Sequence, residues 1–523
     1  MLYYPPLMAL VWFLAASPVL LVVVLMTVLR WPAARAGVIG LAAAMAIAAA
    51  TFGAGIDVQR VALARGLLMA LDVLPIVWGA YLFHRVTDEA GAIEALAEAL
   101  PALTPSRGMQ ALVIGWAFAS FLQGVGGFGV PVAVTAPILA GLGFSPVAAV
   151  LVPSIGHAWA VAFGSLASSF QAMVAATGLA PSALAPASAL ALGVIGLACG
   201  AGAAHAAAGW KETGRLGLAI LAIGVAMGAT HYLLATNGLW PIASVGGGLV
   251  GIGVGLVVAR RVGIGQAQPL PGEVMRRLGY GLQGYAVLVG VISLVQFVAP
   301  LRAVLHRWTV SMLLPSTETL QGFGMPEAAY RYAPLGHTGA LLAYAAILAT
   351  LLYAWRGRAL GRASLRRIIV GTARPMIPAT LGILCMVALA AVMEYAGMIH
   401  VLAEAMAAVT GGGFALVSPW IGALGAFVTG SNTNSNLMFG ALQARTASLL
   451  GMDVPRLLAL QNVGGALGSV VSPAKVIVAV STVGLAGQEG RVMRPLAIAV
   501  GIILLLTSLA AGLGLLFAVV QSA

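Results

Sequence analysis

Two short segments of this chain carry the glycine and polar residues best suited to bind a ligand, and each interrupts a long apolar stretch. Residues 123–131 read Gln-Gly-Val-Gly-Gly-Phe-Gly-Val-Pro, and residues 429–436 read Thr-Gly-Ser-Asn-Thr-Asn-Ser-Asn. In a helix interior glycine costs about 1 kcal/mol and proline about 3 kcal/mol relative to alanine, so the first segment predicts a helix break. The second segment places seven polar side chains among eight residues, a density that is expensive inside a membrane.

Broken helices of this kind can bind a carboxylate, because the free N–H groups at the start of a half-helix form a positive dipole end. We therefore predict one substrate site to which the first segment contributes mainly backbone and the second mainly side chains. A polar loop outside the membrane is the alternative for the second segment. The candidate ligands are Gln123, Gly124, Gly126, Gly127, Gly129, Ser431, Asn432, Thr433, Asn434, Ser435, Asn436 and, in a later segment, Ser472.

Charged or titratable residues inside apolar runs add to this set, since they are rare in membrane spans and usually functional. Lys475, just after Ser472 and Pro473, is placed to neutralise a carboxylate, or alternatively to snorkel from a helix end. His157 is a candidate substrate donor or proton carrier, or else a packing histidine. Glu394 is a second candidate for proton coupling, although an exposed carboxylate near the outer helix end is the simpler interpretation.

Motifs typical of enzymes and ATP-driven pumps are not recognisable in the sequence. Gly124, Gly126 and Gly129 match the G-x-G-x-x-G pattern, but neither a preceding strand nor a βαβ unit is predicted around them. There is no H-E-x-x-H, P-loop, G-x-S-x-G or paired-cysteine motif. We expect no enzymatic activity, no cofactor and no metal, and we expect Cys199 and Cys385 to be buried as small hydrophobic residues.

The elements that position these residues are predicted to be membrane helices. The chain has 523 residues, of which 61% are hydrophobic and 8% charged, with a mean hydropathy of +1.03. Apolar stretches long enough to cross the bilayer recur throughout, and we count about 12 to 14 spans by length. The first stretch has no basic region before it and is full span length, so we interpret it as a retained helix rather than a signal peptide. The predicted class is an all-α, multi-pass protein of the cell membrane.

The net charge of +12 comes from basic residues in short loops between spans rather than on one soluble face. This distribution follows the positive-inside rule and argues against nucleic-acid binding. The predicted cytoplasmic loops are Arg30 to Arg35, His84 to Arg107, Lys211 to Arg215, Arg260 to Arg277 and Arg356 to Arg374. With these loops inside, the apolar helices that precede the two polar segments cross the membrane in opposite directions.

Sliding the chain against itself by about 306 positions reveals a repeat. Phe121 and Gly124 fall on Phe427 and Gly430, and residues 142–146 (Leu-Gly-Phe-Ser-Pro) answer residues 450–455 (Leu-Gly-Met-Asp-Val-Pro). Opposite orientation makes this an inverted-topology repeat with broken helices and re-entrant hairpins, an architecture that places substrate between two halves. The expected regions are N-terminal helices in 1–108, a first repeat core in 109–185, central helices in 186–412, a second repeat core in 413–490 and a C-terminal helix in 491–523.

Four motifs, in residues 121–133, 141–144, 430–436 and 472–473, resemble the L-lactate permease family in order and spacing. The resemblance covers most of the chain. It implies uptake of L-lactate, and often glycolate or related 2-hydroxy monocarboxylates, by proton symport.

Four positions depart from the family pattern. Gln123 stands where the family usually has Glu, and Asn432 where it usually has Asp. Lys475 stands where Gln is more usual, and His157 replaces a small or amide residue. An amide cannot carry a proton, so these departures favour an altered coupling route or a more strongly anionic substrate.

The sequence as a whole predicts a secondary transporter of a small organic anion that works by alternating access between the two repeats. The predicted partners are the anion, a co-transported proton or sodium ion, and the lipid bilayer, and a homodimer is left open. A carrier of another carboxylate or sulfonate coupled to sodium, or a passive anion channel, is the alternative.

Overall fold

A computed structural model describes residues 5–29, 31–99, 106–127, 129–261, 272–356, 360–486, 488–514 and 516. Arg30 and Phe128, and the parts of the predicted basic loops in residues 100–105, 262–271 and 357–359, lie outside the described residues.

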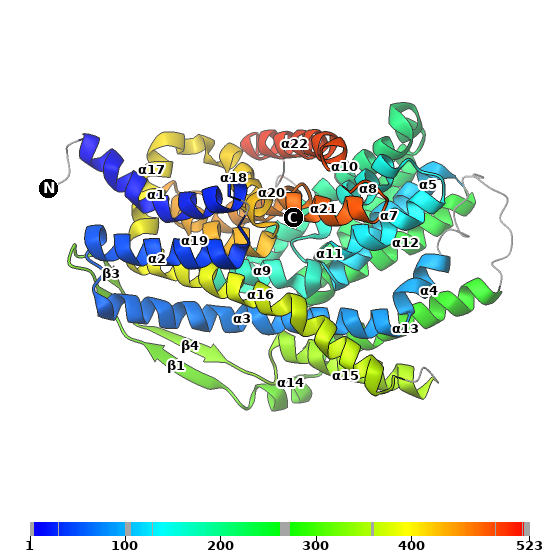
Figure 1. Ribbon diagram of the computed structural model, residues 1–523, viewed down its shortest axis with the longest axis horizontal. Coiled ribbons are helices and arrows are strands. Elements are labelled where there is room, and N and C mark those ends of the chain that lie inside the picture. The colour runs from blue at the N-terminus through cyan, green and yellow to red at the C-terminus, as the bar shows by residue number, and fades with distance from the viewer. Residues whose placement is uncertain are drawn as a thin grey trace.

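The described chain is a bundle of apolar helices, as predicted (Figure 1). Among the described residues, 12 helices are long and apolar enough to cross a membrane, or up to 14 if each of two bent pairs is one span. The helices of the first half are α1 (Pro5–Thr27), α2 (Ala33–Phe52), α3 (Ile56–Glu89), α4 (Ala92–Ala99), α5 (Arg107–Gln110), η2 (Ala111–Phe118), α6 (Ala119–Val125), α7 (Val130–Gly141), α8 (Pro146–Gly156), η3 (Ala158–Ala160), α9 (Gly164–Thr177), α10 (Pro181–Arg215), α11 (Gly217–Thr236), η4 (Trp240–Ile242) and α12 (Ala243–Arg261). The others are α13 (Gly272–Phe297), α14 (Ala299–His306), α15 (Thr338–Trp355), α16 (Arg362–Tyr395), α17 (Met398–Thr410), η5 (Gly411–Gly413), α18 (Phe414–Thr429), α19 (Asn432–Leu449), α20 (Val454–Val470), α21 (Pro473–Ser481) and α22 (Gly490–Gly512).

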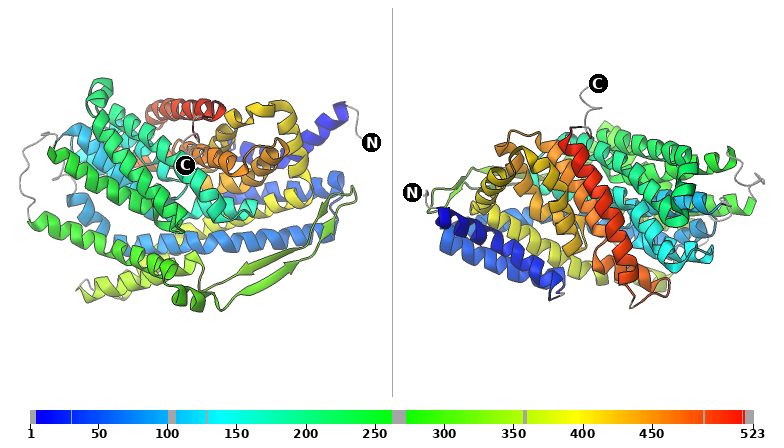
Figure 2. Two further views of the ribbon diagram at one scale, coloured as in Figure 1. Left: turned by 180° about the vertical axis from the view of Figure 1, so that it is seen from behind. Right: turned by 90° about the horizontal axis from the view of Figure 1, so that it is seen from above.

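Helices α3 and α16 are the longest packed pair, with 34 residues each, and they lie side by side (Figure 1, Figure 2). They approach closely where Gly66 faces Ala388, because a Cβ at Gly66 would lie 2.9 Å from the Ala388 Cα. Small residues that allow such close approach are typical of helix contacts in membranes. The pair forms a long support against which α2 and α15 pack.

Most of the predicted cytoplasmic loops gather at one end of the molecule. Arg367, near the start of α16, forms an ion pair of 2.5 Å with Glu89 at the end of α3. Arg277 of α13 pairs with Glu98 of α4. Gly108 also packs against Glu212, so the loop at the end of α10 joins the same end. These contacts place four of the five predicted basic loops on one side.

A pair of short antiparallel sheets between α14 and α15 was not predicted from the sequence. Strand β1 pairs with β4, with Val310 opposite Tyr332, and β2 pairs with β3. The strands have few alternating residues, so the period-2 signal of a strand is weak in this stretch. Their bounds are Val310–Leu314 for β1, Thr317–Glu318 for β2, Gly324–Met325 for β3 and Ala328–Tyr332 for β4.

The predicted repeat reappears as one order of elements in two parts of the chain. In the first part α6 breaks before α7, and α8 breaks before α9 with a bend of 47°. In the second part α18 breaks before α19, and α20 breaks before α21 with a bend of 42°. The turns that precede α8 and α20 match as well, since Ser145 and Asp453 each cap the helix.

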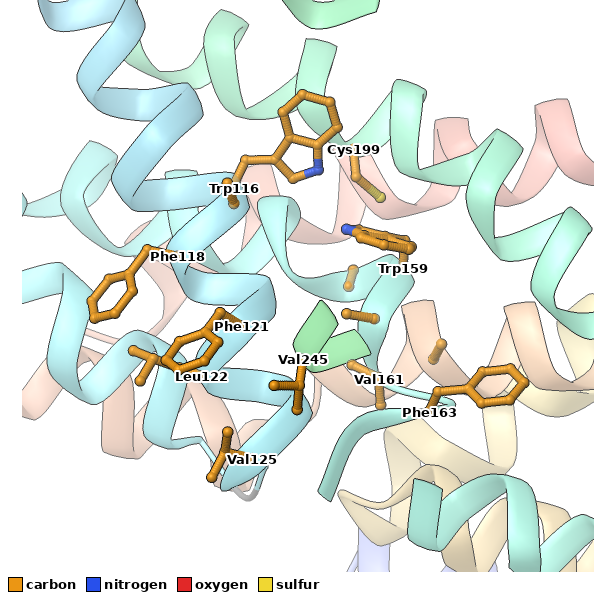
Figure 3. Packing of buried hydrophobic residues seen from close by; sticks show 14 of the residues in the cluster. Trp116, Phe118, Phe121, Leu122, Val125, Trp159, Val161, Phe163, Cys199 and Val245 are labelled. Carbon is orange, nitrogen blue, oxygen red and sulfur yellow. The ribbon is translucent and has the colours of Figure 1, made fainter. Parts of the chain in front are cut away.

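The core around the first repeat is packed through aromatic and small residues (Figure 3). Trp116 and Trp159 are buried, and Gly200 and Gly196 lie against their ring faces. The Trp159 indole N–H donates to Ser120 Oγ at 2.9 Å, so this ring has a polar partner in an apolar region. Cys199 and Cys385 are free and buried, as predicted.

Candidate functional site

The break between α18 and α19 is built by one glycine and one cap. Gly430 ends α18 in the left-handed region, with φ of 71°, where a glycine has no steric penalty. Ser431 then caps α19 by accepting the Asn434 N–H at 3.3 Å. The first turn of α19 therefore starts at residues 432–434, with the positive end of its dipole at the break.

A second half-helix begins beside this break. A Cβ at Gly430 would lie 3.5 Å from the Ser472 Oγ, and Ser472 immediately precedes α21. Lys475 is the third residue of α21, and its ammonium donates to the Ser469 Oγ at 3.1 Å. Among the described residues no carboxylate forms an ion pair with Lys475. Two helix starts and an ammonium group thus meet at one place.

The first repeat contributes its own breaks to the same region. Gly127 and Gly129 have φ of 57° and 89°, which explains the glycines of the predicted segment. At the start of α9, three consecutive non-glycine residues, Ser165, Leu166 and Ala167, also have positive φ, at 47°, 55° and 65°. Such a backbone costs about 1–2 kcal/mol per residue and persists only where the surrounding structure imposes it.

A small cavity of about 30 Å³ has a lining from both repeats, although the predicted ligands Gly127 and Gly129 do not line it. Its volume corresponds to about one water molecule. A second, larger cavity of about 300 Å³ adjoins it, because Gly430, Ser431, Thr433 and Lys475 line both. The remaining residues of the small cavity are Gln123, Val161, Ser165, Ser168, Ser169 and Asn432.

Buried polar atoms without a partner gather around the two cavities. Gln123 Oε1, both side-chain polar atoms of Asn432, Asn434 Oδ1 and Ser472 Oγ have no hydrogen-bond partner within the described chain. Gln123 and Asn432 are only 3% and 2% exposed. A buried polar group without a partner costs about 1–3 kcal/mol, so such groups usually bind a water, an ion or a ligand. These atoms keep hydrogen-bonding capacity that the described chain does not use.

The two repeats are joined directly at this site. Ser169 Oγ and Thr433 Oγ1 lie 3.0 Å apart, within hydrogen-bonding distance, and Asn436 donates to the Ser169 carbonyl at 2.8 Å. The sequence interpretation missed Ser165, Ser168 and Ser169, although Gly164-Ser-Leu-Ala-Ser-Ser169 is another cluster of small and hydroxyl residues inside an apolar stretch.

Several predicted site residues lie elsewhere. Ser435 and Asn436 are fully buried and belong to a hydrogen-bond network with Gln443, Gln461 and Asn462. In that network Gln461 donates to Ser435 Oγ at 3.0 Å, and Asn436 donates to Asn462 Oδ1 at 2.7 Å. These two residues therefore connect α19 to α20 rather than line a cavity.

The other displaced candidates have packing contacts of their own. A Cβ at Gly124 would lie 2.6 Å from the Val245 N, so this glycine serves the contact of α6 with α12. Gly126 packs near His84 and Val130, and His157 Nδ1 lies 2.6 Å from the Pro153 carbonyl one helical turn earlier. Glu394, near the end of α16, lies outside both cavities. Among the described residues no three His, Cys, Asp or Glu side chains gather to hold a metal ion.

Comparisons with known proteins agree on the family. The family model for L-lactate permease matches residues 12–267 and 285–519. The L-lactate permease of Bacillus subtilis is 28% identical over 465 residues, which cover 81% of each chain. The glycolate permease GlcA of Escherichia coli is 27% identical over 521 residues, which cover 92% of this chain and 91% of that one.

Among solved structures, the YdaH transporter of Alcanivorax borkumensis is similar over 86% of this chain and 87% of its own, with a TM-score of 0.46 and 16% identity. The family model covers nearly all of the chain, and the helices are those of a multi-pass protein of the plasma membrane. This chain belongs to the L-lactate permease family.

Proposed function

We propose that this protein is a secondary active transporter that carries a small 2-hydroxy monocarboxylate, such as L-lactate or glycolate, across the membrane together with a proton. The observation that carries the proposal is the set of unpartnered polar atoms around Lys475 and the starts of α19 and α21. The relatives named as permeases of L-lactate and glycolate support the substrate class.

The carboxylate of the substrate would bind where the two cavities meet. Lys475 supplies a positive charge without a carboxylate partner, and the helix starts supply N–H donors with the favourable dipole end. The substrate hydroxyl both donates and accepts a hydrogen bond, so the amides of Gln123 and Asn432 suit it in either direction. Of the atoms without partners, the Asn432 amide nitrogen and the Ser472 hydroxyl can donate to the carboxylate, and the substrate hydroxyl can donate to one of the amide oxygens.

The same geometry accounts for the change from the family's usual acids to amides. Gln123 and Asn432 line the small cavity together with Lys475. A carboxylate at either position would pair with the ammonium and compete with the substrate, whereas an amide leaves Lys475 available. Proton coupling in this chain then depends on groups other than these two, with Lys475 and His157 as candidates, although His157 lies outside both cavities.

Alternating access is part of the proposal. The breaks at Gly127, Gly129 and Gly430 are points where short helices can reorient without rebuilding a continuous helix. Hydrogen bonds between α9 and α19 hold the two repeats together in the present arrangement. Transport requires the repeats to separate on one side and then on the other.

Uptake into proteoliposomes tests the proposal. Radiolabelled L-lactate should accumulate under an inward proton gradient, saturate with concentration, and show counterflow when the vesicles are preloaded with unlabelled lactate. If only a sodium gradient drives accumulation, sodium rather than the proton is the coupling ion. If unlabelled sulfonates or other carboxylates compete for uptake but unlabelled lactate does not, the substrate is one of those anions. Flux that does not saturate and shows no counterflow would indicate a channel.

A further inference from the structure

A third cavity, of about 450 Å³, lies where several helices end and has no part in the site described above. It is bounded by the start of α10, the ends of α11 and α13, the start of α15, and by α14 and β4. We call it the vestibule. Its charged and titratable lining residues are Asp72, Arg302, His306, Arg331, Tyr332 and His337.

The vestibule has more positive than negative charge. Arg302 and Arg331 are exposed, and within the described chain neither forms an ion pair. The single carboxylate, Asp72, accepts the Tyr330 hydroxyl at 2.7 Å. Burial lowers the pKa of His337 to about 4, so this residue is neutral near pH 7. Two arginines without a carboxylate partner leave an electropositive cavity.

The vestibule lies at those ends of α10, α13 and α15 that are opposite the basic loops. Helices α10, α13 and α15 each have one end next to a predicted cytoplasmic loop and the other end at this cavity. The positive-inside rule puts the basic loops in the cytoplasm, so the vestibule opens on the outer face.

One helix connects the vestibule with the central cavities. Ser168 and Ser169 of α9 line the small cavity, whereas Gln171 and Val174, on the same helix, line the vestibule. At 1.5 Å per residue, Ser168 and Gln171 are separated by about 4.5 Å along the helix axis. An anion in the vestibule is therefore close to the proposed substrate site.

From this placement we propose that the vestibule is an outer binding site for the anionic substrate, in which Arg302 and Arg331 capture a monocarboxylate before it reaches Lys475. This inference rests on the proposed function. A concave site lined by one sign of charge raises the local concentration of the opposite ion and speeds its association. Captured substrate would be released along α9 when the breaks open toward this side.

The test is the concentration dependence of L-lactate uptake by cells or right-side-out vesicles containing the Arg302→Gln/Arg331→Gln double variant. We expect KM to rise by about five- to tenfold, the low end of the range for electrostatic steering, with little change in the maximal rate. The increase should shrink at about 0.5 M salt, because screening already removes most of the attraction in the wild type. The Arg302→Lys/Arg331→Lys variant keeps the charge and should restore most of the affinity.

Arg307→Gln is the matched control, because Arg307 is an exposed arginine of the same segment that does not line the vestibule. An unchanged KM and salt dependence in the double glutamine variant, with normal wild-type uptake, would overturn the inference and leave the proposed function intact. Equal effects of Arg307→Gln and the double variant would overturn it as well, because general surface charge would then explain the result. Absence of lactate uptake by the wild type would instead refute the proposed function.

Discussion

The two repeats build their helix breaks by different means, although the order of elements is the same. In the first repeat the backbone turns at glycines and at the left-handed triplet of residues 165–167, and the lining side chains are uncharged. In the second repeat a single glycine suffices, and polar side chains and Lys475 occupy the two helix starts. The first repeat thus supplies mainly shape and the second mainly charge, within one cavity.

This division predicts that loss of Lys475 has the largest effect on transport. A hydrogen bond to a charged group contributes about 1.5–3 kcal/mol, so Lys475→Ala should weaken substrate binding by about ten- to a hundredfold. Equilibrium binding of labelled lactate to the purified protein measures this directly.

Lys211→Ala is the control for that experiment, since Lys211 is the other lysine of the chain and is exposed at the end of α10. If Lys475→Ala binds lactate as tightly as the wild type, the charge of Lys475 does not contribute to substrate binding. The two repeats would then differ only in how they turn the chain.

The next largest effect is expected when a carboxylate is added beside that lysine. Asn432→Asp should raise KM by about tenfold, or about 1.4 kcal/mol, because the new anion pairs with Lys475 and repels the substrate. Because the ammonium favours the ionised aspartate, KM should stay raised between pH 5 and 8. Measurement of KM between pH 5 and 8 checks both expectations.

Gln488→Glu makes an equivalent change from amide to carboxylate at an exposed position before α22, outside the three cavities, and should leave KM unchanged at every pH. A KM for Asn432→Asp that stays at the wild-type value would show that the amide at this position does not protect Lys475.

The span count, the breaks and the repeat were accessible from the sequence because each has a local signature. Glycine density marks the first break, and amide and hydroxyl density marks the second. The strands after α14 could not be predicted from the sequence. They are short and mostly exposed, so burial does not impose an alternation of apolar and polar residues on them.

Which polar residues face the cavity also required the structure. Asn432 and Asn436 lie one helical turn apart in α19 and have the same side-chain chemistry. Asn432 stays without partners at the cavity, whereas Asn436 bonds to Asn462 and to the Ser169 carbonyl. Partners from α9 and α20 decide the difference, and the positions of these helices around α19 are set by the tertiary fold. The positions of the α9 serines also required the structure. The left-handed residues 165–167 include no glycine, so the sequence does not indicate this turn.

A smaller effect is expected from the first repeat's contribution to the lining. Gln123→Ala removes a neutral amide, and a neutral hydrogen bond contributes about 0.5–1.5 kcal/mol, so KM should rise by about three- to tenfold. Kinetics of uptake measure this change. Gln283→Ala is a matched control, because Gln283 of α13 also has an unpartnered amide nitrogen but lies outside both cavities. If Gln123→Ala has as large an effect as Lys475→Ala, charge does not explain the difference in function between the two repeats.

The smallest expected change concerns the left-handed triplet itself. Ala167→Gly relieves a conformation that costs an alanine about 1–2 kcal/mol, and the greater freedom of glycine in the unfolded chain offsets part of this gain. We expect a net stabilisation of about 0.5–1 kcal/mol, seen as a higher thermal midpoint in detergent. Ala175→Gly, in the regular part of α9, should instead destabilise the protein by about 1 kcal/mol.

Transport should move in the opposite direction to stability in Ala167→Gly. Ala167 lies between Ser165 and Ser168, which both line the cavity, so a freer backbone holds them less firmly and lowers the uptake rate. A variant that is more stable and equally active would show that the turn is a feature of packing. A variant that is more stable but transports more slowly would show that the strained turn of the first repeat is needed for transport. Its role would be to fix the shape of the cavity in which the second repeat supplies the charge.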